Sequence, residues 1–139
     1  MSKLIYHFLF LQIFFLSSFT YGNITLNSGD LSLELSEHNN WTVNNLEKNG
    51  RIYLSEWSQS AQGTVLLIDG VWSGSGHGNE TVLHIDLFVD GDEQEIVSGN
   101  SYEGDLIEFI RTTEMGGAYR LVSRMLITPE SIFESIILD

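Results

Sequence analysis

Polar and apolar residues alternate through most of residues 81–89, "TVLHIDLFV". Successive side chains of a β-strand point to opposite faces, so a period of two predicts a strand with one buried and one solvated face. A helix needs apolar residues three and four positions apart, and no stretch after residue 22 has that spacing. The predicted inner face holds Leu83, Ile85, Leu87 and Val89, and the outer face holds His84 and Asp86.

A tight turn follows this strand. Asp90 and Gly91 suit a two-residue hairpin turn, because Asp and Gly tolerate positive φ, so residues 81–97 are predicted to form a β-hairpin. Similar runs are separated by Gly, Asn, Ser and Asp, and Pro129 stands between the last two as a turn residue. The further predicted strands are 31–36, 41–46, 51–57, 64–69, 105–113, 119–128 and 131–138.

Eight or nine short strands joined by turns predict an all-β fold, an antiparallel β-sandwich or barrel. The last run, "IFESIILD", is strongly apolar and forms an exposed edge if nothing pairs with it. Either it is paired inside the sandwich, or the chain is the front part of a larger supersandwich. We favour the second interpretation.

The amino terminus has the three-part layout of a secretory signal peptide. Lys3 precedes an apolar run over residues 4–16, and the polar stretch "SSFTYG" leads to a plausible cleavage point after Gly22. A membrane-spanning helix needs about 20 apolar residues, so this run is short for a retained anchor, which is the alternative. We expect residues 1–22 to be removed and residues 23–139 to form one β-sandwich domain, truncated at its carboxyl end if the supersandwich interpretation holds.

Composition restricts where this domain works and what it binds. The chain has 139 residues, a formal net charge of −13 and no cysteine. An acidic surface repels phosphate groups, which argues against nucleic acid and anionic lipid as partners. An exported domain without disulfides must be held by its core, as is more usual in bacterial envelope and secreted proteins. With no second apolar run long enough to span a membrane, the predicted location is secreted or periplasmic.

The segment "GDLIEFIRTTEMGGAYRLVSRMLITPESIFESIIL", residues 104–138, has a strand ending in Arg, a short turn, the strand "YRLVSRMLITP", and a last strand carrying an outward Glu. With the upstream "WSGSGHGNETVLHIDLFVDGDEQEI", it resembles the strand pattern of galactose-mutarotase-like β-sandwich domains. Such domains occur in aldose 1-epimerases and as parts of polysaccharide lyases and glycoside hydrolases, so the resemblance implies a carbohydrate context. It implies no activity, because the epimerases place their catalytic His and Glu in the later part of a domain about twice this length.

An aromatic strand face is one candidate for a sugar site. In "RIYLSEW", Arg51, Tyr53 and Trp57 share one face, and Trp41 and Trp72 could extend it. Sugar rings stack their CH faces on aromatic rings, and their hydroxyls take hydrogen bonds from polar side chains. The alternative is that the same aromatic residues fill the core between the two sheets.

The glycine-rich stretch "WSGSGHGNE" offers His77 as a second candidate. Its glycine neighbours allow the backbone to approach a ligand closely, and imidazole titrates near physiological pH. His77-Gly78 also echoes a His-Gly pair of the epimerases, but the aromatic and Arg that usually follow that pair are absent. An exposed loop histidine is the simpler interpretation, since no Ser, Cys or Asp accompanies it at a telling spacing.

Arginines are the third candidate in so acidic a chain. Arg120 and Arg124 share a strand face, and Arg111 lies on the preceding strand. They could clamp a uronic-acid carboxylate, or they could pair with Glu108, Glu134 and other acidic neighbours across strands.

The acidic residues around the predicted hairpin are the candidates for a metal site. His84, Asp86 and Asp90 lie at even spacing and could converge with Asp92 or Glu93 across the turn, offering ligands that would suit calcium. The turn lacks the ligand periodicity of an EF-hand, and a solvated outer face accounts for the same residues. We therefore expect no cofactor, with calcium as the alternative.

Three functions follow from these observations. We expect an exported carbohydrate-associated module that binds poly- or oligosaccharide without catalysis of its own. The alternatives are the amino-terminal part of a sugar-active enzyme, mutarotase-like or polysaccharide lyase-like, and a structural or adhesion protein of the cell envelope. The expected ligand-binding residues are Arg51, Tyr53, Trp57, Trp72, His77, Arg120 and Arg124.

Overall fold

A computed structural model describes residues 22–37, 40–54, 65–68, 71–74, 80–117 and 119–138. For Leu54 and for strands β5 (Val65–Ile68) and β6 (Val71–Gly74), the description covers the backbone alone. The predicted signal peptide lies outside the described residues, apart from Gly22. No helix in the described ranges is both long enough and apolar enough to cross a membrane.

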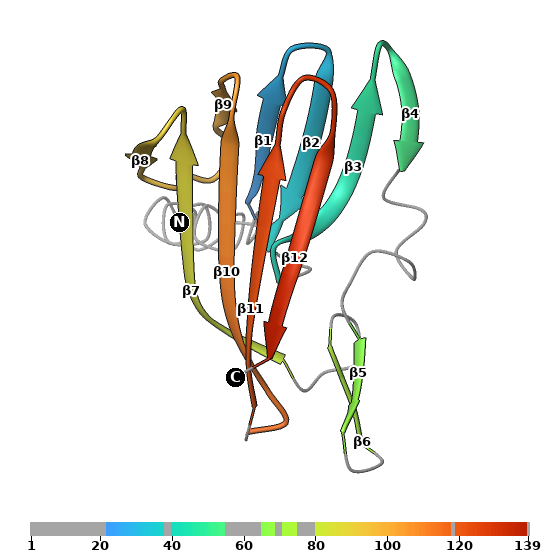
Figure 1. The fold of residues 1–139 in the computed structure, drawn as a ribbon, viewed down its shortest axis with the longest axis vertical. Helices are drawn as coiled ribbons and strands as arrows, with labels where there is room; N and C mark the ends of the chain where they lie inside the picture. The colour runs from blue at the N-terminus through green and yellow to red at the C-terminus, as the bar shows by residue number, and fades with distance from the viewer. Residues whose placement is uncertain are drawn as a thin grey trace, which may run out of the picture.

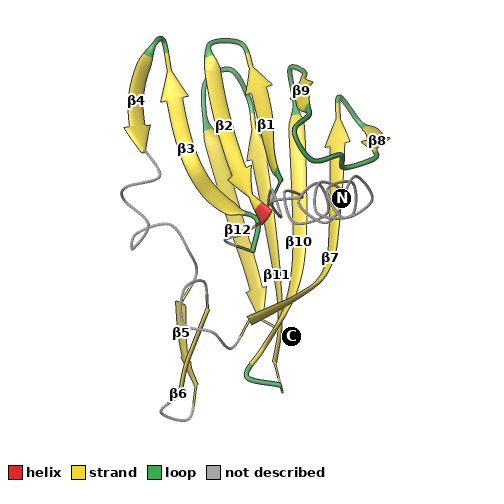
Figure 2. Ribbon diagram, turned by 180° about the vertical axis from the view of Figure 1, so that it is seen from behind, coloured by secondary structure: helices red, strands yellow, loops and turns green. Residues whose placement is uncertain are grey.

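The described residues form strands packed as two layers, which Figures 1 and 2 show from opposite sides. The first sheet has the order β4-β3-β2-β1-β9 and is antiparallel except between β1 and β9. Its strands are β1 (Asn23–Ser28), β2 (Leu31–Ser36), β3 (Thr42–Lys48), β4 (Arg51–Leu54) and β9 (Ser101–Glu103).

The second sheet has the order β12-β11-β10-β7-β8 and is antiparallel throughout. Its strands are β7 (Glu80–Val89), β8 (Asp92–Gln94), β10 (Ile107–Met115), β11 (Tyr119–Ile127) and β12 (Ile132–Leu138). Strands β5 and β6 form a separate hairpin. The prediction of an all-β sandwich is confirmed, with strands β1, β6 and β9 added to those predicted from the sequence.

The core lies between the two sheets and is built from alternate positions. Strand β2 is buried at Leu31, Leu33 and Leu35, and β10 is buried at every second residue from Ile107 to Met115. This alternation is the expected pattern for strands with one face toward a core and the other toward solvent. The buried cluster consists of Ile24, Leu26, Leu31, Leu33, Leu35, Leu87, Ile107, Phe109, Met125 and Ile127.

The predicted hairpin of residues 81–97 is confirmed in its turn and its pairing. Val89 pairs with Asp92 across the two-residue loop, and Asp90 and Gly91 have φ of 51° and 90°. Positive φ at both loop residues gives the backbone twist that matches two antiparallel strands. The Asp90 carboxylate also accepts a hydrogen bond from the Leu106 N–H at 2.8 Å, which ties this turn to the chain entering β10.

The prediction that Leu83 lies on the inner face of β7 is wrong. The pairing of β7 with β10 shifts between Thr112 and Thr113, which pair with His84 and Val82, so Leu83 is the extra residue of a β-bulge. Leu83 is 48% exposed, whereas Leu87 is fully buried. The bulge reverses the alternation for the start of the strand, and Glu80 lies on the inner face.

The last predicted strand pairs with β11 and has no second neighbour among the described strands. It is therefore an edge strand, and Figure 1 shows it at the side of its sheet. Pro129 lies in the turn before it, where the Thr128 N–H donates to the Ser131 carbonyl at 2.9 Å. The prediction of a turn at Pro129 is confirmed.

Candidate functional site

A buried ion pair occupies the inner face of the second sheet. Arg111 follows Ile107 and Phe109 on that face, and its Nη1 lies 3.6 Å from Oε1 of Glu80. The two side chains are 5% and 1% exposed. Burial lowers the pKa of Arg111, and the nearby carboxylates of Glu80 and Glu134 oppose that shift.

Both members of this ion pair form a hydrogen bond with Asn40, which lies between β2 and β3. Arg111 Nη1 donates to the Asn40 carbonyl at 2.6 Å, and the Asn40 amide donates to Glu80 Oε2 at 3.3 Å. Asn40 therefore meets both members of the ion pair, one through its backbone and the other through its side chain. Because Asn40 lies just before β3 of the first sheet, these bonds fix the start of β3 relative to β7 and β10 of the second sheet.

The turn has an unusual backbone. Asn40 and Trp41 have φ of 54° and 61°. Asn tolerates the left-handed region, but a bulky residue such as Trp is an outlier there, and such strain costs roughly 1–3 kcal/mol per residue. The Trp41 N–H donates to the Ser36 carbonyl at 2.7 Å, and its ring lies 6.4 Å from the Phe109 ring, centroid to centroid. The buried ion pair, this hydrogen bond and the ring contact together hold Trp41 in place.

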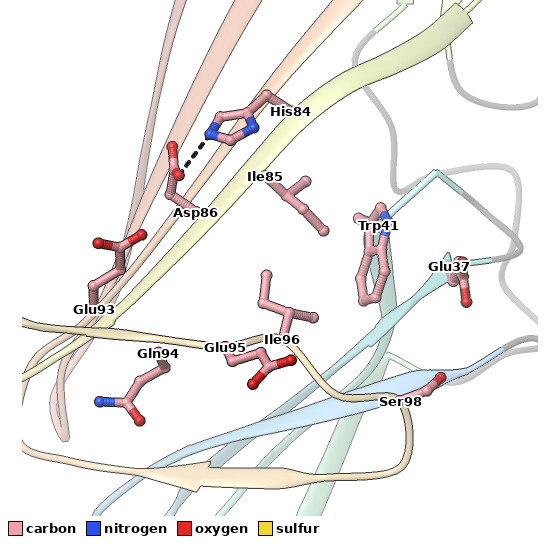
Figure 3. A pocket seen from close by; sticks show the side chains of 10 residues that line it. All are labelled: Glu37, Trp41, His84, Ile85, Asp86, Glu93, Gln94, Glu95, Ile96 and Ser98. Atoms are coloured by element: carbon pink, nitrogen blue, oxygen red, sulfur yellow. Dashed lines mark ion pairs between the residues drawn. The ribbon is translucent and has the colours of Figure 1, made fainter.

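Trp41 lines a pocket beside strand β7 (Figure 3). The pocket has a volume of about 430 Å³, and an adjoining hollow of about 450 Å³ shares Glu37, Trp41, His84 and Ile85. Side chains come from β7 and β8, from the segment after β8, and from Glu37 and Trp41 between β2 and β3. The pocket is lined by Glu37, Trp41, His84, Ile85, Asp86, Glu93, Gln94, Glu95, Ile96 and Ser98.

The lining combines an apolar surface with hydrogen-bonding groups. Figure 3 shows Trp41, Ile85 and Ile96 turned toward one another, while the carboxylates of Glu37 and Glu95 lie at the sides. Gln94 directs its amide away from Trp41, and none of the described lining residues is an Arg or a Lys. Such a pocket can hold a molecule with apolar faces and many hydroxyl groups, and it disfavours an anion.

His84 and Asp86 contact each other rather than converging with the turn. His84 Nε2 lies 2.7 Å from Asp86 Oδ1 on the outer face of β7. Asp90 is engaged with the Leu106 N–H. Within the described ranges, no group of three or more His, Asp or Glu side chains is arranged to hold a metal ion.

The structure brings Arg51 and Tyr53 together on strand β4. The Arg51 guanidinium carbon lies 5.5 Å from the centroid of the Tyr53 ring, which is within reach of a cation–π contact. Tyr53 is 56% exposed, so it is not core filling. Both residues lie on an edge strand of the first sheet and neither lines the Trp41 pocket.

Arg120 and Arg124 lie on the second sheet, on the outer face of β11. Arg124 donates to a Glu108 carboxylate oxygen, and this bond raises the pKa of Arg124. Arg120 stands opposite Glu114 in the register. The predicted pairing of Arg124 with Glu108 is confirmed, while Arg111 lies on the opposite face from these two arginines.

The other predicted residues cannot be placed in this way. Trp57 and His77 lie outside the described residues. Trp72 belongs to strand β6, paired with Leu67, and the description of that strand covers the backbone alone.

Sequence reasoning missed the ion pair, although one signal was present. In "IEFIRTTEM" the spacing of two that places Ile107 and Phe109 inside also places Arg111 inside. A buried arginine requires an acidic partner, so this spacing predicts that a buried Asp or Glu lies beside Arg111. Nothing in the sequence indicates that the partner is Glu80, because the bulge at Leu83 decides which face Glu80 takes.

Comparison of the whole chain with models of protein families, with curated proteins and with solved structures finds no match.

Proposed function

We propose that this protein is an exported carbohydrate-binding β-sandwich module, and that the pocket beside Trp41 is the sugar site. The observation that carries the proposal is the strained Trp41 turn, which the buried Arg111–Glu80 pair holds at the pocket. Backbone strain of this kind is concentrated at functional sites, where the surrounding structure maintains it. The strand-pattern resemblance to galactose-mutarotase-like domains is a second, independent support for a carbohydrate ligand.

The pocket suits a neutral sugar better than an acidic one. A pyranose ring can lie with its CH face on the Trp41 indole, and Glu37 and Glu95 can hydrogen-bond its hydroxyl groups. The carboxylates of the lining and the net charge of −13 both repel a uronic acid. The ligand proposed is therefore a neutral poly- or oligosaccharide.

The test is a glycan array, followed by calorimetry on the saccharides that bind. Trp41→Ala is expected to weaken binding at least tenfold, a loss of about 1.4 kcal/mol, because it removes the stacking surface. Glu95→Ala should weaken binding as well, and Glu95 is exposed, so its replacement leaves the core untouched.

Tyr53→Ala and Trp57→Ala are the matched controls, since they remove aromatic rings from residues 51–57, the strand that the sequence predicts as a sugar site. Both should bind normally. Loss of binding in these variants with full binding in Trp41→Ala would move the site to that strand. If no saccharide binds the unmodified protein, the proposed function is wrong.

A further inference from the structure

Strand β12 presents an unusually apolar sheet edge. It pairs with β11 alone among the described strands, so one side of its backbone has no described strand hydrogen-bonded to it (Figure 1). Of the nine large hydrophobic residues that are exposed in the described part of the chain, four belong to this strand. They are Phe133, Ile136, Ile137 and Leu138, which are 62%, 45%, 62% and 53% exposed.

The usual protections against edge pairing are missing from β12. Natural edges are kept short, bulged, charged or interrupted by Pro. The edge strands β8 and β9 have three residues each, whereas β12 has seven and pairs with β11 without a bulge. The one charged residue of β12, Glu134, pairs with the buried Met125 and accepts a hydrogen bond from the buried Ser123 hydroxyl at 2.5 Å, so it lies on the inner face and the prediction of an outward Glu is wrong.

We infer that β12 pairs with β12 of a second copy of this chain, antiparallel about a two-fold axis through Ser135. This register pairs all seven residues of the strand. On the outer face Phe133 lies opposite the partner's Ile137 on both sides of the axis, and on the inner face Ile132 lies opposite the partner's Leu138. Aromatic and β-branched residues are favourable cross-strand pairs.

The other two-fold registers are poorer. Directly opposite residues of two antiparallel strands point to the same face of the sheet. A two-fold axis perpendicular to the sheet must therefore pass midway between one residue and the same residue of the partner, and the register is named by that residue. Centring on Glu134 places the two Glu134 carboxylates opposite each other, and like charges in that position are destabilising. Centring on Ile136 pairs residues 134–138 and leaves Phe133 outside the overlap. The register through Ser135 is the longest, and it places no charged residue opposite another.

The dimer joins two sheets into one continuous sheet and leaves the Trp41 pocket outside the contact, since no residue of β12 lines that pocket. Each copy carries a net charge of −13, so the two copies repel one another at long range. Added salt screens that repulsion, because the Debye length falls from about 10 Å at 0.1 M to about 3 Å at 1 M. Dimerisation is therefore expected to strengthen as sodium chloride is raised.

Sedimentation equilibrium of the protein purified from an exporting host tests this inference. The dissociation constant is expected to fall with added salt, and Ile137→Lys should raise it at least tenfold because it places an ammonium opposite the partner's Phe133. Combining Ile137→Lys with Phe133→Glu should restore the dimer, since the register brings the two new charges together. A protein that is monomeric at all concentrations and salt levels would overturn the inference.

Cysteine cross-linking tests the register in the same preparation. The chain has no native cysteine, so one introduced thiol gives an unambiguous signal. Ser135→Cys faces its own copy across the axis and should form a disulfide-linked dimer on mild oxidation, because directly opposite residues have Cβ atoms about 4.5–5.5 Å apart and a small shift brings them to the roughly 3.5–4.5 Å of a disulfide. Ile137→Cys faces Phe133 of the partner subunit and should not. Equal cross-linking of both variants would refute the register through Ser135.

Discussion

The Arg111 guanidinium and the Glu80 carboxylate form an ion pair that is almost completely withdrawn from water, with 3.6 Å between Nη1 and Oε1. Both groups also contact Asn40, the residue before Trp41. Taking charges out of water is costly, and a buried pair often contributes less to stability than apolar residues of the same volume. We infer that the role of this pair is to position Trp41, because both of its members hydrogen-bond Asn40 next to Trp41 at the pocket.

Removing one partner of this pair should be far more damaging than removing both. Arg111→Met takes the cation from a buried carboxylate and the donor from the Asn40 carbonyl, so we expect the free energy of unfolding to fall by about 3–5 kcal/mol. The double replacement Arg111→Met with Glu80→Met should recover most of that loss. Urea denaturation measures both values.

Arg124→Met is the matched control for this experiment. Arg124 pairs with Glu108 on the outer face, where its side chain is half exposed, and exposed pairs contribute little. A loss in Arg124→Met as large as that in Arg111→Met would mean that burial does not determine the effect.

Because of the bulge at Leu83, we expect alanine substitution of two leucines in β7 to have different effects on stability. A regular strand would bury Leu83 and Leu87 alike, but Leu83 is 48% exposed and Leu87 is fully buried. Leu87→Ala should cost about 2–5 kcal/mol through lost burial and a cavity, and Leu83→Ala should cost well under about 1 kcal/mol. Similar losses in thermal or urea unfolding would show that β7 has no bulge.

The hairpin turn between β7 and β8 depends on Gly91. Its φ is +90°, and a Cβ added there would meet nothing within 4 Å, so any cost of Gly91→Ala comes from the backbone conformation. We expect a loss of about 1–2 kcal/mol in the free energy of unfolding. Asp92→Ala, at an exposed position next to the turn, serves as the control and should unfold at nearly the wild-type urea concentration. An unchanged midpoint for Gly91→Ala would rule out this turn geometry.

The local pattern of the sequence was sufficient for nine of the twelve described strands, all but β1, β6 and β9, and for the Asp90-Gly91 turn, because alternation and turn residues act over a few neighbouring positions. It was not sufficient for the site. The contact of Arg111 with Asn40 joins residues 71 positions apart, and the inward position of Glu80 depends on one extra residue in β7. Neither leaves a periodic trace in the sequence.

The candidate binding residues show the same division. The sequence suggests Trp41 as an extension of the platform around Tyr53, yet the structure separates the two: Trp41 lines the pocket, and Tyr53 lies on the edge strand β4. Arg124 was recognised as a partner for Glu108, since cross-strand neighbours can be inferred once two adjacent strands are known. The positive φ of Trp41 has no sequence signal, because the sequence predicts a strand that begins at Trp41 and Trp is a residue type enriched in strands.

Fluorescence of Trp41 tests the central claim most directly. The chain has three tryptophans, so Trp57→Phe combined with Trp72→Phe leaves Trp41 as the one tryptophan reporter. Titration with a neutral oligosaccharide that binds the protein should change the Trp41 emission saturably, with the same dissociation constant that calorimetry gives. Calorimetric binding of that saccharide without any change in Trp41 emission would contradict the assignment of the sugar site to this pocket.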